Sequence, residues 1–285
     1  MTERVLELSI KNNIALYAIH TNLDNHKNGV NKRIADKIGL SELKILSQKN
    51  ETLVKLCVFV PEAAEPALSA ALFNSGAGAV GNYSECNFKS KGIGSFKPNL
   101  SAKPSLGEIN KKTETTEVKT EYLVPLAQLS MVLNAMRENH PYEEVAYDVI
   151  PLLNTQQDMG SGMIGVLQEP MTTQSFLKHL KTTFNVGVIK HTALLHDKVK
   201  TVAICGGSGS FLIDAARRNK ADIFITSDIK YHEFFDANNE IIIADIGHWE
   251  SEQFTVNLLY ENIKEKFSKF ALHLTEENTN PVKYF

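Results

Sequence analysis

The sequence has few cysteines, and their positions limit the kind of protein it can be. Only three occur, Cys57, Cys86 and Cys205, far apart in the chain and without a CxxC pair. Because their number is odd, a framework of paired disulfides is disfavoured. We expect three buried thiols.

Long apolar runs and an excess of positive charge are also missing. No stretch approaches the roughly 18 apolar residues of a membrane span, and the opening MTERVLELSIKNN lacks the apolar core of a secretory signal. The 30 Lys and Arg against 33 Asp and Glu give a net charge of −3, and no basic, aromatic stripe occurs. We therefore expect a cytoplasmic protein that binds neither membranes nor nucleic acids.

The composition that is present is ordinary for a globular protein. Of 285 residues, 43% are hydrophobic and 22% are charged, and this length suits one large domain or two of common size. The pattern of apolar runs changes twice along the chain. We interpret it as an α/β core, residues 1–52 and 156–285, interrupted by an inserted α+β domain, residues 53–155.

The predicted insert has the order strand–helix–strand–strand–helix–strand. This βαββαβ order is that of a ferredoxin-like fold, in which two helices cover one face of an antiparallel sheet. A polar stretch over 99–116 is a predicted long connection, and NTQQDMGSG is a predicted exit linker. The expected strands fall at 54–61, within 79–97 and 115–124, and at 145–152, and the helices at 62–78 and 125–140.

The predicted core alternates strands with helices, which is typical of a layered α/β sheet. In its first part an apolar strand begins at Asn13, a helix within 29–40 is closed by Gly39, and a polar stretch occupies 41–51. In its second part, strands are expected at 163–168, 186–190, 198–205, 221–226 and 240–246, with helices at 172–184, 209–220 and 249–267.

The segment DIGHWESE places His248 and Glu252 four residues apart after an apolar run. If a helix begins near Gly247, the two side chains share one face, and an imidazole and a carboxylate at this spacing can bind one divalent cation. The alternative is an ordinary helix start, where acidic residues are favoured by the helix dipole.

Two further polar segments follow predicted strands, where α/β proteins commonly place functional groups. AIHTNLDNH carries His20, Asp24 and His26, and its alternative is a polar turn. TSDIKYH carries Asp228, Lys230 and His232. Asp228 could orient a ligand histidine, and Lys230 or His232 could contact an anionic substrate or transfer protons. The alternative is that Ser227 or Asp228 caps the next helix.

Two remaining segments favour structural interpretations. CGGSGS could bind an anion through free backbone N–H groups, but it is neither a P-loop nor a GxGxxG motif. We expect a tight turn with positive φ there. In NHPYEEVAYD, Pro141 stops the preceding helix, and the carboxylates beside His140 indicate a structural or regulatory surface rather than a catalytic one.

HTNLD, CGGSGS, TSDIKYH and DIGHWESE, in this order, resemble the GTP cyclohydrolase 1 type 2 homolog family, also called Nif-three-like proteins. The insert, with HPYEEVAYDVIPL, is similar to the PII- or CutA-like domain of longer bacterial members. The resemblance covers nearly the whole chain. It implies a Nif-three-like layered core interrupted by a ferredoxin-like insert, assembled as a homohexamer.

The resemblance also implies a site for two divalent metal ions per subunit. Matched by motif, Asp24, His248 and Glu252 are ligands, while Asp228, Lys230 and His232 line the site. Their nitrogen and oxygen donors suit zinc, manganese, iron, cobalt or nickel. The family's remaining ligands come from an adjacent His-His pair, which this sequence lacks. We therefore expect either an N-terminally shortened chain or a protein with an incomplete site.

Two functions are consistent with these features. The first is a metal-dependent hydrolase that activates a water molecule, with a small molecule or nucleotide as substrate. The family name suggests opening of a purine ring, although phosphoester or amide-like bonds suit the same chemistry. The second is a non-catalytic metal-binding platform with a regulatory, ligand-sensing insert, which the absent His-His pair favours.

Overall fold

The chain forms two β-sheets, and each sheet belongs to a separate unit of the fold. The computed structural model describes residues 2–284. Unit 1 comprises Met1–Ser47 with Gly160–Phe285, and unit 2 comprises Gln48–Met159. The fold is therefore mixed α/β with two sheets, as predicted. No helix within the described residues has the length and apolar character to cross a membrane.

Unit 1 contains a six-stranded sheet of mixed direction with the order β1-β6-β8-β9-β10-β7. Strands β8, β9 and β10 are parallel neighbours, whereas β6 pairs antiparallel with β8 and β7 antiparallel with β10. The strands are β1 (Leu40–Gln48), β6 (Gly160–Thr172), β7 (Lys190–His191), β8 (Lys198–Ser208), β9 (Ile223–Ser227) and β10 (Ile242–Asp245).

The parallel strands of this sheet are buried on both faces. Along β9, Ile223 and Ile225 pack in one apolar cluster while Phe224 packs in another. Such burial explains why β9 and β10 appear in the sequence as continuous apolar runs rather than as alternating patterns. The helices and 3-10 turns around the sheet are α3 (Val30–Ile38), α6 (Thr173–Phe184), η2 (Ser210–Leu212), α7 (Ile213–Arg218), η3 (Tyr231–Ala237), α8 (His248–Glu252) and α9 (Thr255–Lys266).

Two helices of this unit end or begin as their sequences predict. Gly39 follows α3 in the left-handed conformation, with φ 85°, and its N–H bonds to carbonyls of the last turn. The hydroxyl of Thr172 accepts a hydrogen bond from the N–H of Ser175 at the start of α6. Both ends therefore follow from local chemistry.

Four predictions for unit 1 were wrong. Residues 14–19 form no strand, and Leu16 and Tyr17 are 61% and 87% exposed, because no neighbouring strand pairs with them in the described chain. The polar stretch from Ser41 is strand β1. Residues 186–190 are irregular except at the start of β7, and the helix expected over 249–267 is broken into α8 and α9. Ahead of these elements, α1 (Thr2–Lys11) and the short α2 (Thr21–Asp24) complete the unit.

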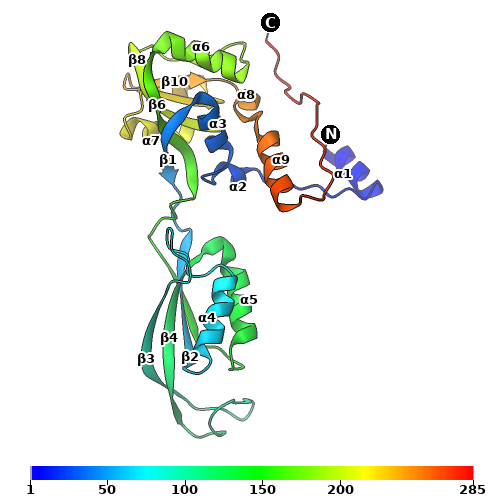
Figure 1. Ribbon diagram of the computed structural model, residues 1–285, viewed down its shortest axis with the longest axis vertical. Helices are drawn as coiled ribbons and strands as arrows, with labels where there is room; N and C mark the ends of the chain where they lie inside the picture. Colours follow the sequence, from blue (N-terminus) through cyan, green and yellow to red (C-terminus); the bar gives the residue numbers. More distant parts are fainter. Residues whose placement is uncertain (1, 285) are drawn as a thin grey trace. The chain divides into compact units, whose positions relative to one another are not determined.

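Unit 2 contains a four-stranded antiparallel sheet with the order β3-β4-β2-β5. Helices α4 and α5 lie on the same side of it (Figure 1). Leu68 and Leu72 of α4 and Val132 and Met136 of α5 are buried in one cluster with the strands. The elements are β2 (Leu53–Pro61), α4 (Glu65–Asn74), β3 (Asn87–Phe96), β4 (Thr113–Pro125), η1 (Leu126–Gln128), α5 (Leu129–Asn139) and β5 (Tyr147–Pro151).

The cysteines occupy different environments within these units. Cys57 and Cys205 are buried, as predicted, whereas Cys86 is partly exposed, so the prediction for it was wrong. Cys86 lies just before β3, outside the apolar cluster of its unit.

Candidate functional site

Parallel strands bring two of the polar segments together. Asp228 directly follows β9 and His248 follows β10, and these strands are parallel neighbours. Their carboxyl ends therefore meet at one edge of the sheet, which is where α/β proteins commonly bind ligands. A pocket of about 1200 Å³ lies at this edge and is lined by Asp24, Asp228, His248 and Glu252.

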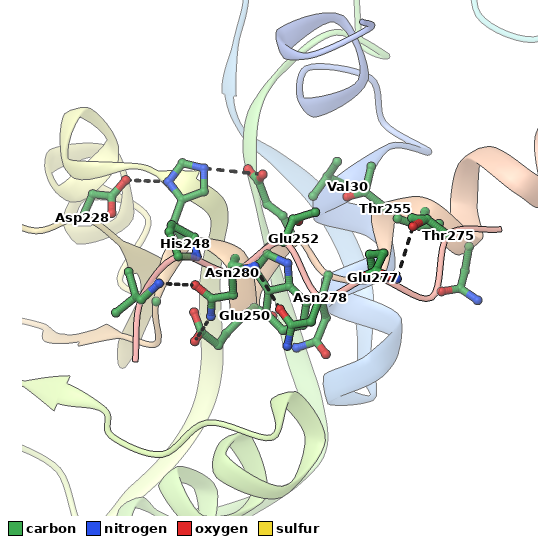
Figure 2. Close-up of a pocket in the computed structure, with 18 of the residues that line it drawn as sticks. Val30, Asp228, His248, Glu250, Glu252, Thr255, Thr275, Glu277, Asn278 and Asn280 are labelled. Atoms are coloured by element: carbon green, nitrogen blue, oxygen red, sulfur yellow. Dashed lines mark hydrogen bonds and ion pairs between the residues drawn. The ribbon is translucent and has the colours of Figure 1, made fainter. Parts of the chain in front are cut away.

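The imidazole of His248 lies between two carboxylates (Figure 2). Its Nδ1 is 2.6 Å from Oδ2 of Asp228, so Nδ1 carries the proton and donates a hydrogen bond to that carboxylate. Its Nε2 faces Oε2 of Glu252 at 3.5 Å. The Asp228 contact therefore fixes the ring and directs the second nitrogen toward Glu252.

Helix α8 places His248 and Glu252 on one face, as the sequence predicted. The helix is preceded by Gly247, whose φ of 93° favours glycine, and the N–H of Ser251 bonds to the carbonyl of Gly247 at 3.1 Å. One turn of helix separates the two side chains. The spacing read from the sequence is thus realised in the structure.

The glycine-rich end of β8 makes room for Glu252. Gly207 has φ 65°, and a Cβ at this position would overlap the Glu252 carboxylate. Its N–H also donates to Oγ of Ser251 at 2.9 Å. The positive φ at Gly207 agrees with the prediction, but the predicted tight turn was wrong, because β8 continues to Ser208 with a shift of its register against β9 after Ile204. The missing side chain of Gly207 lets the Glu252 carboxylate lie against the strand.

Asp24 also lines this pocket. It is the last residue of α2, which precedes all strands of the sheet in the sequence. It is half-buried, and its backbone carbonyl accepts a hydrogen bond from Nδ2 of Asn31 in α3 at 3.0 Å. His20 also lines the pocket and has φ 37°, unusual for a residue other than glycine. His26 is exposed, and its Nδ1 accepts from the N–H of Asn28 in a local turn.

The charges of these groups influence one another. Burial raises the pKa of Asp24, and the charges of His20 and His248 only partly oppose it. Burial also raises the pKa of Glu252, with Asp24 adding to the effect and His248 opposing it. For His248 burial acts to lower the pKa, but the hydrogen bond to Asp228 and the charges of Glu252 and Asp24 outweigh it, so its pKa is raised. This edge is an acidic environment in which a cation is favoured.

Cys205 lies beneath this acidic group. Burial, followed by the charges of Asp24 and Glu252, raises the pKa of its thiol to about 12. The thiol is therefore protonated near neutral pH and is a weak candidate for a metal ligand, because the thiolate is the ligating form.

Lys230 and His232 lie away from the pocket. Both side chains are exposed and neither lines it. Lys230 precedes η3, and its N–H donates to the carboxylate of Glu233 at 2.8 Å. The helix after β9 is thus preceded by Lys230 rather than by Ser227 or Asp228. His232 packs edge-on against the ring of Tyr231, with centroids 5.3 Å apart.

Two buried carboxylates and the C-terminal segment also line the pocket, and the sequence patterns did not predict them as site residues. Asp245 is 2% exposed and forms an ion pair with Lys190 at 2.6 Å. Glu250 is 6% exposed, and its Oε1 accepts from Nδ2 of Asn280 at 2.9 Å (Figure 2). Residues 274–282 form a wall of the pocket. The sequence feature that could have indicated an ordered segment there is NTNP, residues 278–281, because asparagine favours turns.

The residues present fit part of a metal site. Nε2 of His248 and Oε2 of Glu252 are farther apart than in a normal hydrogen bond, and two ligands held roughly 2.0–2.2 Å from a shared ion lie at about this separation. Asp24 is a third donor in the pocket. Within residues 2–284, however, no three His, Cys, Asp or Glu side chains are already close enough to hold an ion.

The fold and this edge define a mixed α/β protein with two sheets, the larger of which carries carboxylates and an imidazole where its parallel strands end. The chain belongs to the Duf34/NIF3 (NGG1p interacting factor 3) family, whose family model matches residues 1–281. This confirms the family predicted from the four motifs.

Relatives with the name GTP cyclohydrolase 1 type 2 homolog are similar to nearly the whole chain. The one from Bacillus subtilis is 37% identical over 291 residues, which cover 99% of this chain and 77% of the relative. The one from Halalkalibacterium halodurans is 39% identical over 268 residues, covering 93% and 71%. Among solved structures, the Bacillus cereus protein related to NIF3 matches with a TM-score of 0.80 and 36% identity, covering 99% of this chain and 77% of that one.

Proposed function

We propose that this chain binds divalent metal ions at the edge of the unit 1 sheet and acts as a metal-dependent hydrolase. The observation that carries the proposal is the row Asp228–His248–Glu252, in which Asp228 holds Nδ1 at 2.6 Å and leaves Nε2 facing a carboxylate. A carboxylate that fixes the far nitrogen of a histidine is the usual support of a metal ligand.

Asp24, His248 and Glu252 would hold the metal, and Asp228 would position His248. Bound metal would lower the pKa of a coordinated water molecule and so supply hydroxide near neutral pH. Partial burial raises the pKa of Asp24 and of Glu252, so a nearby cation would favour their charged forms. Mixed nitrogen and oxygen donors suit zinc, manganese, iron, cobalt or nickel.

The name of the relatives suggests a nucleotide as the substrate to test first. Those proteins are called GTP cyclohydrolase 1 type 2 homologs. The pocket, at about 1200 Å³, is large enough for a ligand of nucleotide size. Its walls are acidic on the side of Glu252, so we propose that metal ions accompany an anionic substrate there.

Metal content per chain is the direct test of binding. The full chain is loaded with Zn²⁺ or Mn²⁺, passed through a desalting column and measured by elemental analysis. We expect bound metal in the wild type and a loss of at least half of it in Glu252→Gln and His248→Ala, because each removes one donor. Glu265→Gln, an exposed carboxylate of α9, is the matched control and should not change the content.

Turnover of GTP and other nucleotides is then compared between the loaded chain and the same chain stripped by a chelator. Hydrolysis that depends on metal and is lost in Glu252→Gln supports the proposal. Wild type that takes up no metal would overturn it, whereas metal uptake without hydrolysis of any nucleotide would reject only the hydrolase.

We further propose that residues 53–155 are an inserted ferredoxin-like, PII- or CutA-like domain and that the protein self-associates as a homohexamer. The order βαββαβ and the placement of α4 and α5 on one sheet face support the first. Exposed apolar residues of the first segment, including Ile10, Leu16 and Tyr17, support the second. Sedimentation of the full chain tests the oligomeric state.

A further inference from the structure

Unit 2 contains a second pocket, of about 460 Å³, that has no part in the metal-site proposal. Its apolar walls include Phe59, Phe96 and Tyr142, and the rings of Phe96 and Tyr142 lie 6.4 Å apart at a tilt of 53°. Its volume is within the range of small-molecule sites, and its aromatic walls are typical of them.

The charges at this pocket are mostly of one sign. Three carboxylates line it, Glu117, Glu143 and Glu144, against one ammonium group, Lys97. Oε1 of Glu143 accepts the backbone N–H of Lys103 at 2.7 Å and so ties down the loop that forms one wall. A carboxylate beside aromatic faces favours a cation, because both attract positive charge.

Glu117 is held in place at one of its two carboxylate oxygens. Its Oε1 accepts the phenol O–H of Tyr142 at 2.9 Å. Within the described part of the chain, no hydrogen bond reaches its second oxygen, Oε2. A Cβ at Gly94 would overlap that oxygen, so the absent side chain on β3 is what lets the carboxylate lie across the strand.

The turn that carries Tyr142 is itself fixed by His140. The N–H of Tyr142 donates to Nδ1 of His140 at 3.1 Å, so Nε2 carries the proton and donates to the carbonyl of Phe59 at 3.0 Å. The two rings also pack edge-on at 5.1 Å. Tyr142, which holds Glu117, is therefore itself held by His140, and His140 is held by the carbonyl of Phe59.

We propose that this pocket binds a small organic cation with an apolar or aromatic body, whose ammonium or amidinium group donates to Oε2 of Glu117 while its body packs against Phe96 and Tyr142. A bare metal ion would leave the aromatic walls of Phe96 and Tyr142 without a partner, whereas an organic cation uses both the carboxylate and the rings. An anionic ligand would meet the three carboxylates. The site is independent of the metal-site proposal.

The experiment uses the full chain and three probes of matched shape. Phenethylamine, which is a cation at neutral pH, is compared with the neutral 2-phenylethanol and the anionic phenylacetate by isothermal titration and by ligand-observed NMR. We expect phenethylamine to bind about tenfold or more tightly than the neutral probe, as a charge-assisted hydrogen bond implies, and phenylacetate not to bind.

Two pairs of variants connect that preference to Glu117. Glu117→Gln removes the charge and should weaken phenethylamine binding about tenfold, while Glu114→Gln on the same strand, outside the pocket, should not. Gly94→Ala displaces the carboxylate and should weaken binding similarly. Gly92→Ala is its control, because a Cβ there meets only open space. Circular dichroism and melting temperature verify that each variant is folded.

Equal binding of the cationic and neutral probes would overturn the proposal, and so would preferential binding of phenylacetate. No binding of phenethylamine at millimolar concentration by the folded wild type would also overturn it. Unchanged affinity in both Glu117→Gln and Gly94→Ala would place any binding elsewhere. Stripping the chain of metal should leave phenethylamine binding unchanged, which separates this proposal from the metal-site proposal.

Discussion

Asp228 has a backbone conformation that few residues adopt, and its side chain holds the imidazole of His248. Its φ is 56°, in the left-handed region where aspartate and asparagine are tolerated better than most residues. That conformation turns the chain at the end of β9 and brings Oδ2 within 2.6 Å of His248. The residue therefore determines both the tautomer and the direction of the imidazole.

The change Asp228→Asn should weaken metal binding without unfolding the protein. Asparagine keeps the shape and tolerates positive φ, but it removes the charge that supports His248. We expect Zn²⁺ or Mn²⁺ affinity to fall about 10- to 100-fold, as for other residues that support a ligand, measured by isothermal titration. Asp236→Asn, an exposed carboxylate of η3, is the control. Equal affinity in wild type and Asp228→Asn would contradict the positioning role.

His140 makes the stability of unit 2 depend on pH. Burial lowers its pKa below the ordinary 6.5, although the bond to the Phe59 carbonyl and the charge of Glu117 act in the opposite direction. Since the fold favours the neutral ring, its contribution is present above about pH 6.5 and is lost as pH falls through the lower, folded pKa. Protonation of Nδ1 would also remove the acceptor for the Tyr142 N–H.

We therefore expect the free energy of unfolding of unit 2 to be lower near pH 5 than near pH 7.5. In His140→Gln, which cannot titrate, the difference between the two pH values should be smaller. Urea unfolding followed by far-UV circular dichroism measures both. An identical pH dependence in the variant would show that other groups cause it.

Helix α6 illustrates how an element of unit 1 is stabilised at its end and along its face. Thr172 caps it, and Phe176, Leu180 and Phe184 are fully buried against the sheet. Their spacing of about four residues is the helical period, so the sequence was sufficient to predict the element. The edge strand β1 is the opposite case, because only Leu40 and Leu46 of its nine residues are buried.

Thr172→Ala should destabilise unit 1 by about 1 kcal/mol, because the N–H of Ser175 loses its acceptor. Thr172→Ser keeps the hydroxyl and should cost much less. Trp249 is the one tryptophan of the chain and lies in unit 1, so its fluorescence during urea unfolding reports this unit. Equal losses in the two variants would contradict a capping role.

At the scale of the whole molecule, each unit has its own apolar core. Leu56, fully buried in unit 2, packs in a cluster made only of unit 2 residues. The clusters of unit 1 likewise contain only its own residues. A change in one core should therefore affect the stability of that unit more than the chemistry of the other.

Leu56→Ala should lower the free energy of unfolding of unit 2 by about 2–5 kcal/mol, through lost burial and the cavity it leaves. The Trp249 unfolding curve and the metal content should stay close to wild type. Leu180→Ala, in the core of unit 1, should shift the Trp249 unfolding curve to lower urea and leave the free energy of unfolding of unit 2 close to wild type. A Leu56→Ala variant that lost metal content while unit 1 remained folded would contradict this independence.

The sequence by itself determined the features that depend on near neighbours along the chain. These include the end of α3 at Gly39, the buried strands β9 and β10, and the shared face of His248 and Glu252. Helical spacing, apolar runs and glycine conformation are local properties, and local sequence encodes them.

Only the tertiary structure decided which distant segments meet. Asp228 and His248 are 20 residues apart, and they touch because β9 and β10 pair in parallel. The polar Ser41 belongs to a strand because β6 lies beside β1, whereas the apolar run from Ile14 is not a strand because nothing in the described chain pairs with it. Strand pairing is a contact between segments far apart in sequence, so residue type alone does not fix it.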